Sequence, residues 1–173
     1  GLVQRHLDGV RLEPGQVEAI VAQRDARGAV VDPGATEIVG TTAVIPITGV
    51  IAKHASQVGD VSQPQGTSTT AVSAELRAAL ADPKVQSILL AIDSPGGSVD
   101  GVAALGDQIH AANDQKPVTA YIDGMGASAA YWLASQAGRV VAGKDAAVGS
   151  IGVYATVRDN SRAVKNASVD VKL

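Results

Sequence analysis

The chain has 173 residues, a net charge of −3 and no cysteine. Its length suits one domain with a sizeable core, and its 46% hydrophobic and 18% charged residues are typical of a globular protein. Because no basic cluster stands out, nucleic acid is not expected as a partner. The lack of cysteine excludes a disulfide framework, a thiolate zinc site and a cysteine nucleophile.

Aromatic residues make up only 2% of the chain, and phenylalanine is absent. The core must therefore consist of Val, Ile, Leu and Ala, which favours a layered α/β fold. No stretch approaches the ~18 apolar residues of a membrane span, and GLVQRHLDGV lacks the apolar region of a signal peptide. The first residue is Gly rather than Met, and we expect the natural ends of the protein to lie beyond this sequence.

The N-terminal residues 1–40 predict a leader with one short amphipathic helix. Val17, Ile20 and Val21 share one face of a helix from Pro14 to Arg24. A connector rich in Gly, Asp and Pro leads to a predicted buried strand, 42–51. The next segment, 55–70, is rich in Ser, Thr, Gln and Gly, and predicts a mobile surface loop.

From Val72 onward the sequence alternates between helical and strand patterns. The apolar spacing predicts helices at 72–82, 102–109, 127–137 and 158–165. The predicted strands are 85–93, 117–123, 139–143, 147–157 and one beginning at 168. This alternation predicts a parallel sheet joined by right-handed βαβ crossovers.

Two of these strands end in corners that contain glycine, IDSPGGSVDG and IDGMGASAAYW. In a parallel sheet both corners lie at the same edge, where ligands bind. Gly96 and Gly97 permit close backbone approach and can aim N–H groups outward. Ser128 opens a helix whose field favours negative charge, and Ala129 offers a second N–H. The corners thus supply a candidate nucleophile and donors for an oxyanion.

Simpler explanations exist for each motif by itself. A lone serine in this position is more often a helix N-cap, and PGG is more often a plain turn. Their occurrence at two adjacent strand ends favours catalysis. Motifs for phosphate, dinucleotide or metal binding such as GxxxxGK[ST], GxGxxG and HExxH are absent, so no cofactor and no metal are predicted.

A serine nucleophile needs a base. His6 and His110 are expected in a tail and on a solvated helix face, which leaves His54 as the one plausible histidine. No histidine follows Ser128. A lysine can act as base where burial lowers its pKa. The lysines after Ser128 are Lys144, Lys165 and Lys172, and each of them could equally be a solvated surface residue.

The motifs IDSPGGSV, GMGASAAYW and VGSIGV together resemble those of the S49 serine peptidases. This family includes signal peptide peptidase A and the phage head-maturation capsid proteases. The resemblance runs from about Thr42 to the end, which suggests a peptidase domain at 41–173. It implies an α/β fold, the ClpP/crotonase-like superhelix of repeated ββα and βαβ units.

The resemblance also implies roles for individual residues. Ser128 would be the nucleophile, with Tyr131 at the aromatic position of its motif. Gly96 and Gly97 would build the oxyanion hole together with Ala129. Ser150 would help to hold a catalytic lysine, although by itself it reads as a turn serine. That lysine lies in the family beyond the strand that VDVKL resembles, so we expect the domain to be truncated before it or a neighbouring subunit to supply it.

Within the family, the soluble leader favours the phage branch over the membrane-anchored peptidases. That branch implies cleavage of capsid or scaffold proteins inside a prohead in the host cytoplasm, by a homo-oligomer. A signal peptide peptidase-like domain that clears membrane-derived peptides, membrane-associated if an anchor was removed, remains an alternative.

The sequence also leaves three rival functions open. A ClpP-like Ser-His-Asp peptidase needs a histidine after Ser128. A crotonase-type acyl-CoA enzyme does not need the serine. A catalytically silent structural or scaffold-binding module would keep only the fold.

Overall fold

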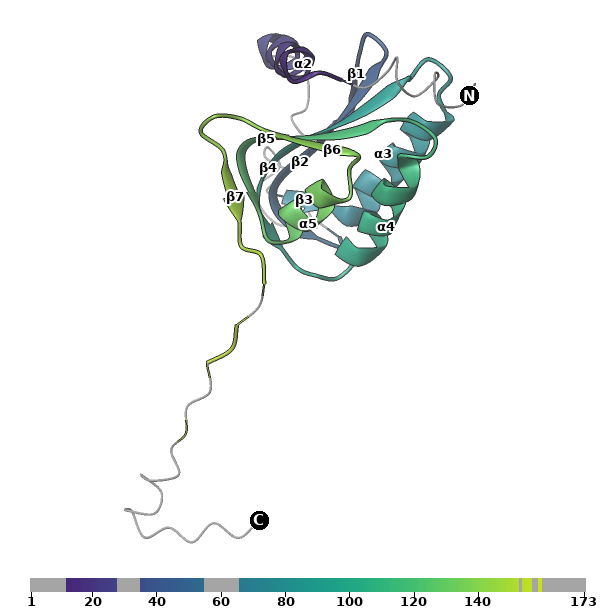
Figure 1. The fold of residues 1–173 in the computed structure, drawn as a ribbon. Coiled ribbons are helices and arrows are strands. Elements are labelled where there is room, and N and C mark those ends of the chain that lie inside the picture. The colour runs from purple at the N-terminus through teal and green to yellow at the C-terminus, as the bar shows by residue number, and fades with distance from the viewer. Residues whose placement is uncertain (1–11, 28–34, 55–65, 153, 157–158, 160–173) are drawn as a thin grey trace, which may run out of the picture.

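The computed structural model describes residues 12–27, 35–54, 66–152, 154–156 and 159. These residues form an α/β fold around one twisted sheet (Figure 1). The elements in chain order are α2 (Pro14–Arg27), β1 (Glu37–Val39), β2 (Thr42–Ala52), β3 (Gly66–Ser68), α3 (Thr69–Ala81), β4 (Ser87–Gly97), α4 (Val102–Ala112), β5 (Val118–Ala127), α5 (Ala129–Ser135), β6 (Arg139–Ala142) and β7 (Ala147–Gly149).

The strand order is β1-β2-β4-β5-β6, with β3 beside β2 and β7 beside β5. Only β1 runs antiparallel to its neighbour, and all other described pairs are parallel. The predicted parallel sheet is therefore confirmed. In such a sheet the strands β4 and β5 end at the same edge, and their last residues define the candidate site.

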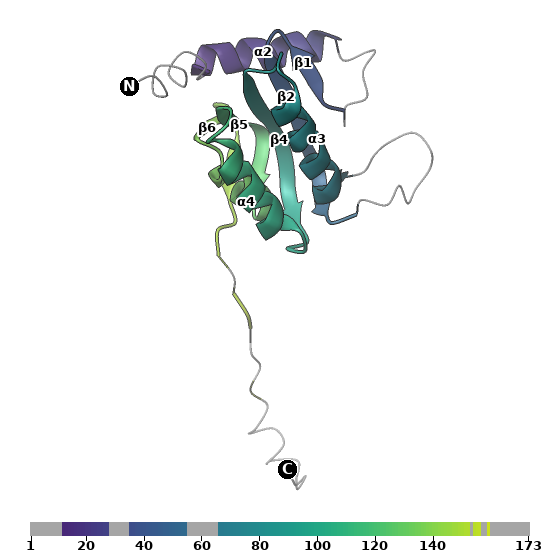
Figure 2. The same cartoon turned by 90° about the vertical axis from the view of Figure 1, so that its right-hand side faces the viewer.

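The sheet is covered on both faces (Figure 2). On one face the helices α3, α4 and α5 enclose the larger apolar cluster, which includes Ile45, Ile47 and Leu133. On the other face α2 packs against Val44 and Leu89 through Val17 and Val21. Successive residues of a strand point to opposite faces, so β2 and β4 are buried almost throughout their central residues.

Hydrogen bonds at both ends define α3. At its start, the Ser68 hydroxyl accepts a hydrogen bond from the Ala71 N–H at 3.3 Å. At its end, the Lys116 ammonium donates to the carbonyl oxygens of Ala79 and Asp82, at 2.8 and 2.7 Å. A cation at this end donates hydrogen bonds to carbonyls that have no partner within the helix. Its positive charge also interacts favourably with the negative end of the helix dipole.

Most of the predicted elements are confirmed, although β4 and β5 extend further than expected, to Gly97 and Ala127. The predicted helix 14–24 is α2, and its apolar face is buried as expected. Both α2 and β1 contact the main sheet. Whether residues 1–40 form a separate leader stays a prediction.

Two predictions were wrong in part. The predicted loop 55–70 contains β3 and the start of α3, because the Thr67 hydroxyl donates to the Thr48 carbonyl and accepts from the Thr48 N–H, both at 2.8 Å. The predicted strand 147–157 ends at Gly149, because Ser150 has a φ of 55°, which no strand tolerates. Residues 55–65, the strand from 168, and the helix at 158–165 apart from Asp159 lie outside the described residues.

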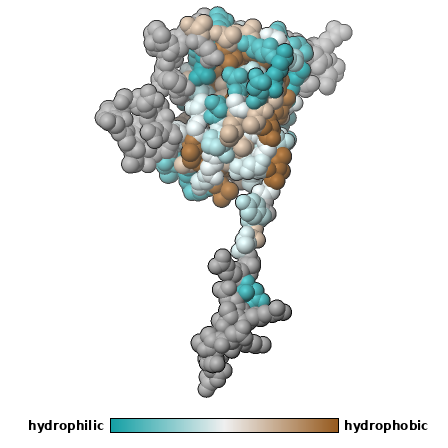
Figure 3. Space-filling view, turned by 90° about the vertical axis from the view of Figure 1, so that its left-hand side faces the viewer, coloured by the Kyte–Doolittle hydropathy of each residue, from teal (hydrophilic) through white to brown (hydrophobic). Residues whose placement is uncertain are grey.

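Several large apolar side chains are exposed, among them Val99 at 75%, Ile151 at 73% and Tyr154 at 94%. In Figure 3 the brown, hydrophobic residues lie in separate patches on the face that is shown. Among the described helices, none has the length and apolar character that a membrane crossing would require.

Candidate active site

The glycine corners that follow β4 and β5 touch each other. A β-carbon placed on Gly96 would lie 2.7 Å from the Ala127 carbonyl oxygen, 2.8 Å from the Ser128 Cβ and 2.9 Å from the Ala129 nitrogen. Gly96 also has a φ of 94°, which L side chains rarely adopt. Only glycine therefore allows the first corner to pack directly against the serine of the second.

Ser128 occupies the sharp turn between β5 and α5. Its φ and ψ are 54° and −122°, a conformation that is strained for any residue with a side chain. Its N–H donates to the Gly149 carbonyl at 3.1 Å, and its own carbonyl accepts from Trp132 at 3.0 Å. The hydroxyl makes no capping hydrogen bond to α5, and the residue is exposed. Ser128 thus stands at the N-cap position of α5 without the side-chain hydrogen bond of a cap, and its hydroxyl is exposed.

Ser150 follows β7 as Ser128 follows β5. The strands β5 and β7 pair in parallel, with Ala127 opposite Gly149. Each serine directly follows one residue of this pair. Ser150 has a φ of 55°, close to that of Ser128. Both serines line one pocket of about 460 Å³. The structure thus brings the two predicted serines to one site.

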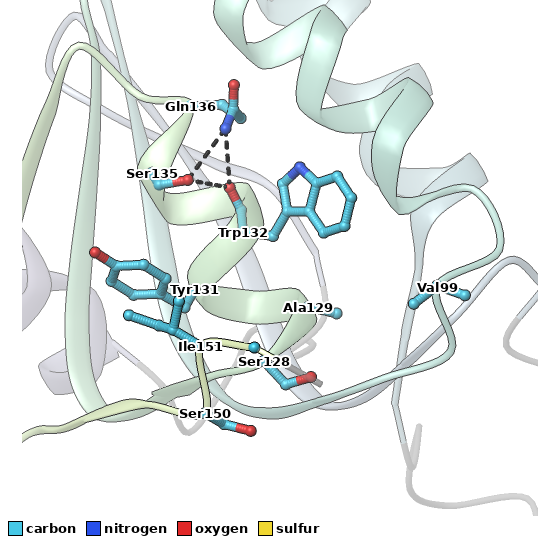
Figure 4. A pocket seen from close by; sticks show the side chains of 10 residues that line it. Val99, Ser128, Ala129, Tyr131, Trp132, Ser135, Gln136, Ser150 and Ile151 are labelled. Carbon is cyan, nitrogen blue, oxygen red and sulfur yellow. Dashed lines mark hydrogen bonds between the residues drawn. The ribbon is translucent and has the colours of Figure 1, made fainter. Parts of the chain in front are cut away.

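The pocket lies at the start of α5 (Figure 4). The indole of Trp132 extends toward α4, whereas Tyr131 and Ile151 lie on the opposite side of α5, and Val99 stands apart on the loop after β4. The lining residues are Val99, Ser128, Ala129, Tyr131, Trp132, Ser135, Gln136, Ser150, Ile151 and Gly152. Apart from the two serines, only Ala129 and Tyr131 among them were expected at the site from the sequence.

The corner at the end of β4 has three successive N–H groups, those of Gly96, Gly97 and Ser98, and the first and last of them are hydrogen-bonded. The Gly96 N–H donates to the Ser94 hydroxyl at 3.1 Å, and the Ser98 N–H donates to the Ile51 carbonyl at 2.8 Å. Because alternate N–H groups of a strand point to opposite sides, the Gly97 N–H faces away from β2. Gly97 is also exposed, whereas Gly96 is buried. Of the two predicted glycines, Gly97 is thus the one whose N–H faces away from both β2 and Ser94.

Ala129 is the first residue of α5. The N–H groups in the first turn of a helix have no acceptor within the helix. The Ala129 nitrogen lies beside Gly96, as the short approach to a Gly96 β-carbon shows. The first backbone N–H of α5 therefore lies at the point where the two corners meet.

The candidate bases that the structure describes lie elsewhere. His54, His110 and Lys144 are exposed, and no described histidine or lysine lines the pocket. Lys53 forms an ion pair with Asp100 at 3.5 Å. The remaining candidates, His6, Lys165 and Lys172, lie outside the described residues. Within the described ranges no cluster of three potential metal ligands occurs.

Sequence reasoning missed Ser94, which is fully buried behind the first corner. Its hydroxyl donates to the Gly49 carbonyl at 2.6 Å and accepts from Gly96. A serine two residues before a glycine turn is a known pattern of local hydrogen bonding and could have been noticed. Val99, Trp132 and Ile151 carry no such signal, because their place at the pocket depends on the packing of distant segments.

The chain resembles solved crotonase-type enzymes in fold. An enoyl-CoA hydratase from Mycobacterium avium subsp. paratuberculosis K-10 superposes with a TM-score of 0.53 at 16% sequence identity, over 69% of this chain and 50% of that one. At this identity the likeness concerns the fold alone. The predicted ClpP/crotonase-like α/β fold is confirmed.

Several proteins that are similar in sequence are proteases. Protease 4 of Salmonella typhi is 35% identical over 131 residues, which cover 75% of this chain and 20% of that protein. Capsid assembly protease C of Escherichia phage lambda is 33% identical over 137 residues, which cover 79% of this chain and 31% of that protein. The chain thus spans about a fifth to a third of the length of these relatives. Residues 110–173 match the model of peptidase family S49, and with these relatives the match identifies the chain as a member of that family.

Proposed function

We propose that this chain carries the catalytic centre of a serine endopeptidase, with Ser128 as the nucleophile. The observation that carries the proposal is the Ser128 corner. A strained, exposed serine with no capping hydrogen bond stands beside backbone donors from two strand ends. Membership of a peptidase family and relatives that are proteases support the same chemistry.

The proposed reaction is acyl transfer in two steps. A base removes the proton of the Ser128 hydroxyl, and the oxygen attacks the carbonyl carbon of a peptide bond. The N–H groups of Gly97 and Ala129 donate to the oxyanion that forms. The C–N bond then breaks, the amine leaves with the proton, and water hydrolyses the ester to release the acid and restore the serine. In this scheme Gly96 serves close packing, because its N–H already donates to Ser94.

For the base we propose a neutral lysine that Ser150 holds in place, and we place this lysine outside the described residues. Lys53 is paired with Asp100, and Lys116 donates to the carbonyls that end α3. Lys84 and Lys144 are exposed and do not line the pocket. A lysine from a neighbouring copy would satisfy the same requirement, which is consistent with the homo-oligomer that we propose.

As substrates we propose capsid or scaffold proteins of a phage prohead in the host cytoplasm. Capsid assembly protease C is the relative that supports this proposal, and it matches 79% of this chain. The alternative is the clearance of membrane-derived peptides, which the similarity to Protease 4 keeps open. In both cases residues 41–173 would form the peptidase domain.

Cleavage of an unfolded protein such as casein tests the proposal. The chain by itself, the chain within its natural flanking sequence, and the latter with Ser128→Ala would be compared by gel electrophoresis. We expect the wild type in its flanking sequence to cut and the Ser128→Ala variant to be inactive. Equal cleavage by the variant would refute the role of Ser128. Absence of cleavage in every form would favour a silent structural module.

A further inference from the structure

The buried hydroxyl of Ser94 has a geometry that suits control of the oxyanion corner. The residue is fully buried, with an exposed fraction of 0%. Its Oγ donates to the Gly49 carbonyl at 2.6 Å and accepts the Gly96 N–H at 3.1 Å. The one hydroxyl hydrogen is therefore used, and the oxygen serves as an acceptor for the corner.

Both partners of Ser94 belong to irregular backbone. Gly49 has a φ of 64°, and the register between β2 and β4 shifts between Thr48 and Val50. Gly96 has a φ of 94°. A hydroxyl that bridges two such residues fixes the end of β4 to the bulge of β2, where the regular ladder of backbone hydrogen bonds is interrupted.

The Gly96–Gly97 peptide, which carries the Gly97 N–H, lies between two N–H groups that are hydrogen-bonded. With the Gly96 N–H held on Ser94 and the Ser98 N–H held on Ile51, the peptide between them is oriented from both sides. The Gly97 N–H then faces away from β2. Two adjacent glycines impose little restraint of their own, because glycine populates many backbone conformations. The hydrogen bonds, together with the pairing of Gly96 with Val50 and of Gly97 with Ile51, therefore restrain this peptide.

We propose that Ser94 is a positioning residue, which aims the Gly97 N–H at the oxyanion by holding the Gly96 N–H away from the pocket. This inference rests on the proposed function of Ser128. Without the hydroxyl, a buried N–H loses its acceptor, and rotation of the Pro95–Gly96 peptide toward another acceptor relieves the loss. That rotation would displace the Gly97 donor while the pocket itself stays intact.

The predicted consequence is a loss of turnover without a loss of substrate binding. Removal of one oxyanion donor lowers kcat by about 10²–10³-fold. A displaced donor should cost less, so Ser94→Ala is expected to lower kcat by about 10–100-fold and to leave KM within about twofold. A peptide boronic acid, which forms a tetrahedral adduct with an active serine, should bind more weakly by the same factor as kcat/KM.

Ser87 provides a matched control in the same strand. It is also buried, at 2% exposed, and its hydroxyl is hydrogen-bonded to that of Thr42 at 2.9 Å. It stands at the opposite end of β4 from the candidate site. Ser87→Ala removes a comparable buried hydrogen bond, so it should lower the melting temperature by a similar amount and leave kcat and the boronate affinity unchanged.

The experiment measures kcat, KM, boronate affinity and melting temperature for wild type, Ser94→Ala, Ser94→Cys, Ser87→Ala and Ser128→Ala in the natural flanking sequence. Cysteine nearly preserves the volume of Ser94, and its sulfur accepts and donates hydrogen bonds only weakly. Ser94→Cys should therefore give an intermediate kcat, and it carries the test if Ser94→Ala does not fold. An unchanged kcat in both Ser94 variants, or equal losses in Ser87→Ala, would overturn the inference. Turnover in Ser128→Ala equal to that of the wild type would instead overturn the proposed function.

Discussion

Gly96 and Ser128 lie so close together that a β-carbon on Gly96 would approach the Ser128 Cβ to 2.8 Å. The two residues belong to different strand ends, far apart in the sequence. This contact joins the corner that offers backbone donors to the corner that offers the hydroxyl. The proposed chemistry therefore depends on the absence of a side chain at Gly96.

Gly96→Ala should both destabilise the fold and abolish turnover. The added methyl group meets backbone atoms at 2.7 and 2.9 Å, and alanine is strained at a φ of 94°. Gly40→Ala is the matched control, because Gly40 has a φ of 63° but no atom within 4 Å of the added carbon. Strain alone should cost about 1 kcal/mol in Gly40→Ala and leave activity intact. If urea unfolding gives the same loss of stability for Gly96→Ala and Gly40→Ala, the close contact between Gly96 and the Ser128 corner does not contribute to the effect.

Ser128→Gly should be more stable than Ser128→Ala by about 1 kcal/mol, because only glycine relaxes at a φ of 54° and a ψ of −122°. Both variants should lose at least about 10³-fold in kcat. Ser73, inside α3, provides the control, and there glycine should be less stable than alanine by about 1 kcal/mol. If urea unfolding shows alanine to be more stable than glycine at position 128, as it should be at position 73, the backbone of Ser128 is not strained.

Ser150→Ala should lower kcat by about 10–100-fold, if the residue holds the general base, whose own contribution is typically 10²–10⁴-fold. Ser135 lines the same pocket, but its hydroxyl donates to the Trp132 carbonyl at 2.7 Å. Ser135→Ala should therefore leave kcat unchanged. Steady-state kinetics on one fluorogenic peptide would compare the two, and equal rates in both variants would exclude a catalytic role for Ser150.

Lys116→Met should destabilise the fold by about 1–2 kcal/mol without affecting catalysis. The substitution removes two charge-assisted hydrogen bonds to the last carbonyls of α3. Lys84, just beyond the same helix end, is exposed, and Lys84→Met should change the free energy of unfolding by less than about 0.5 kcal/mol. Chemical denaturation measures both, and equal effects would mean that the Lys116 contacts contribute nothing.

Much of the fold follows from patterns that are local in sequence. The runs of Val, Ile and Leu in β2, β4 and β5 predicted buried parallel strands, and Val102, Leu105 and Ile109 predicted α4 with its buried face. The start of β3 could not be predicted, because the Thr67 hydroxyl finds its partner in Thr48, on another strand. The end of β7 at Gly149 depends on the positive φ of Ser150, which the sequence gives no reason to expect of a serine.

The candidate site was predictable in its residues but not in its geometry. Ser128, Ser150, Gly96, Gly97 and Ala129 were named from motifs, and the structure gathers them at one edge of the sheet. The separate roles that we propose for the two glycines could not be read from the sequence. They rest on the hydrogen bond that the Gly96 N–H donates to the buried Ser94 hydroxyl.

Covalent capture of Ser128 tests the central claim most directly. The protein in its natural flanking sequence would be treated with a β-lactone, which acylates reactive serines, digested, and analysed by mass spectrometry. The proposed mechanism predicts one adduct, on the peptide that contains Ser128, with casein cleavage lost in proportion to labelling and no adduct in Ser128→Ala. Labelling of a different residue, or full cleavage after complete labelling of Ser128, would contradict it.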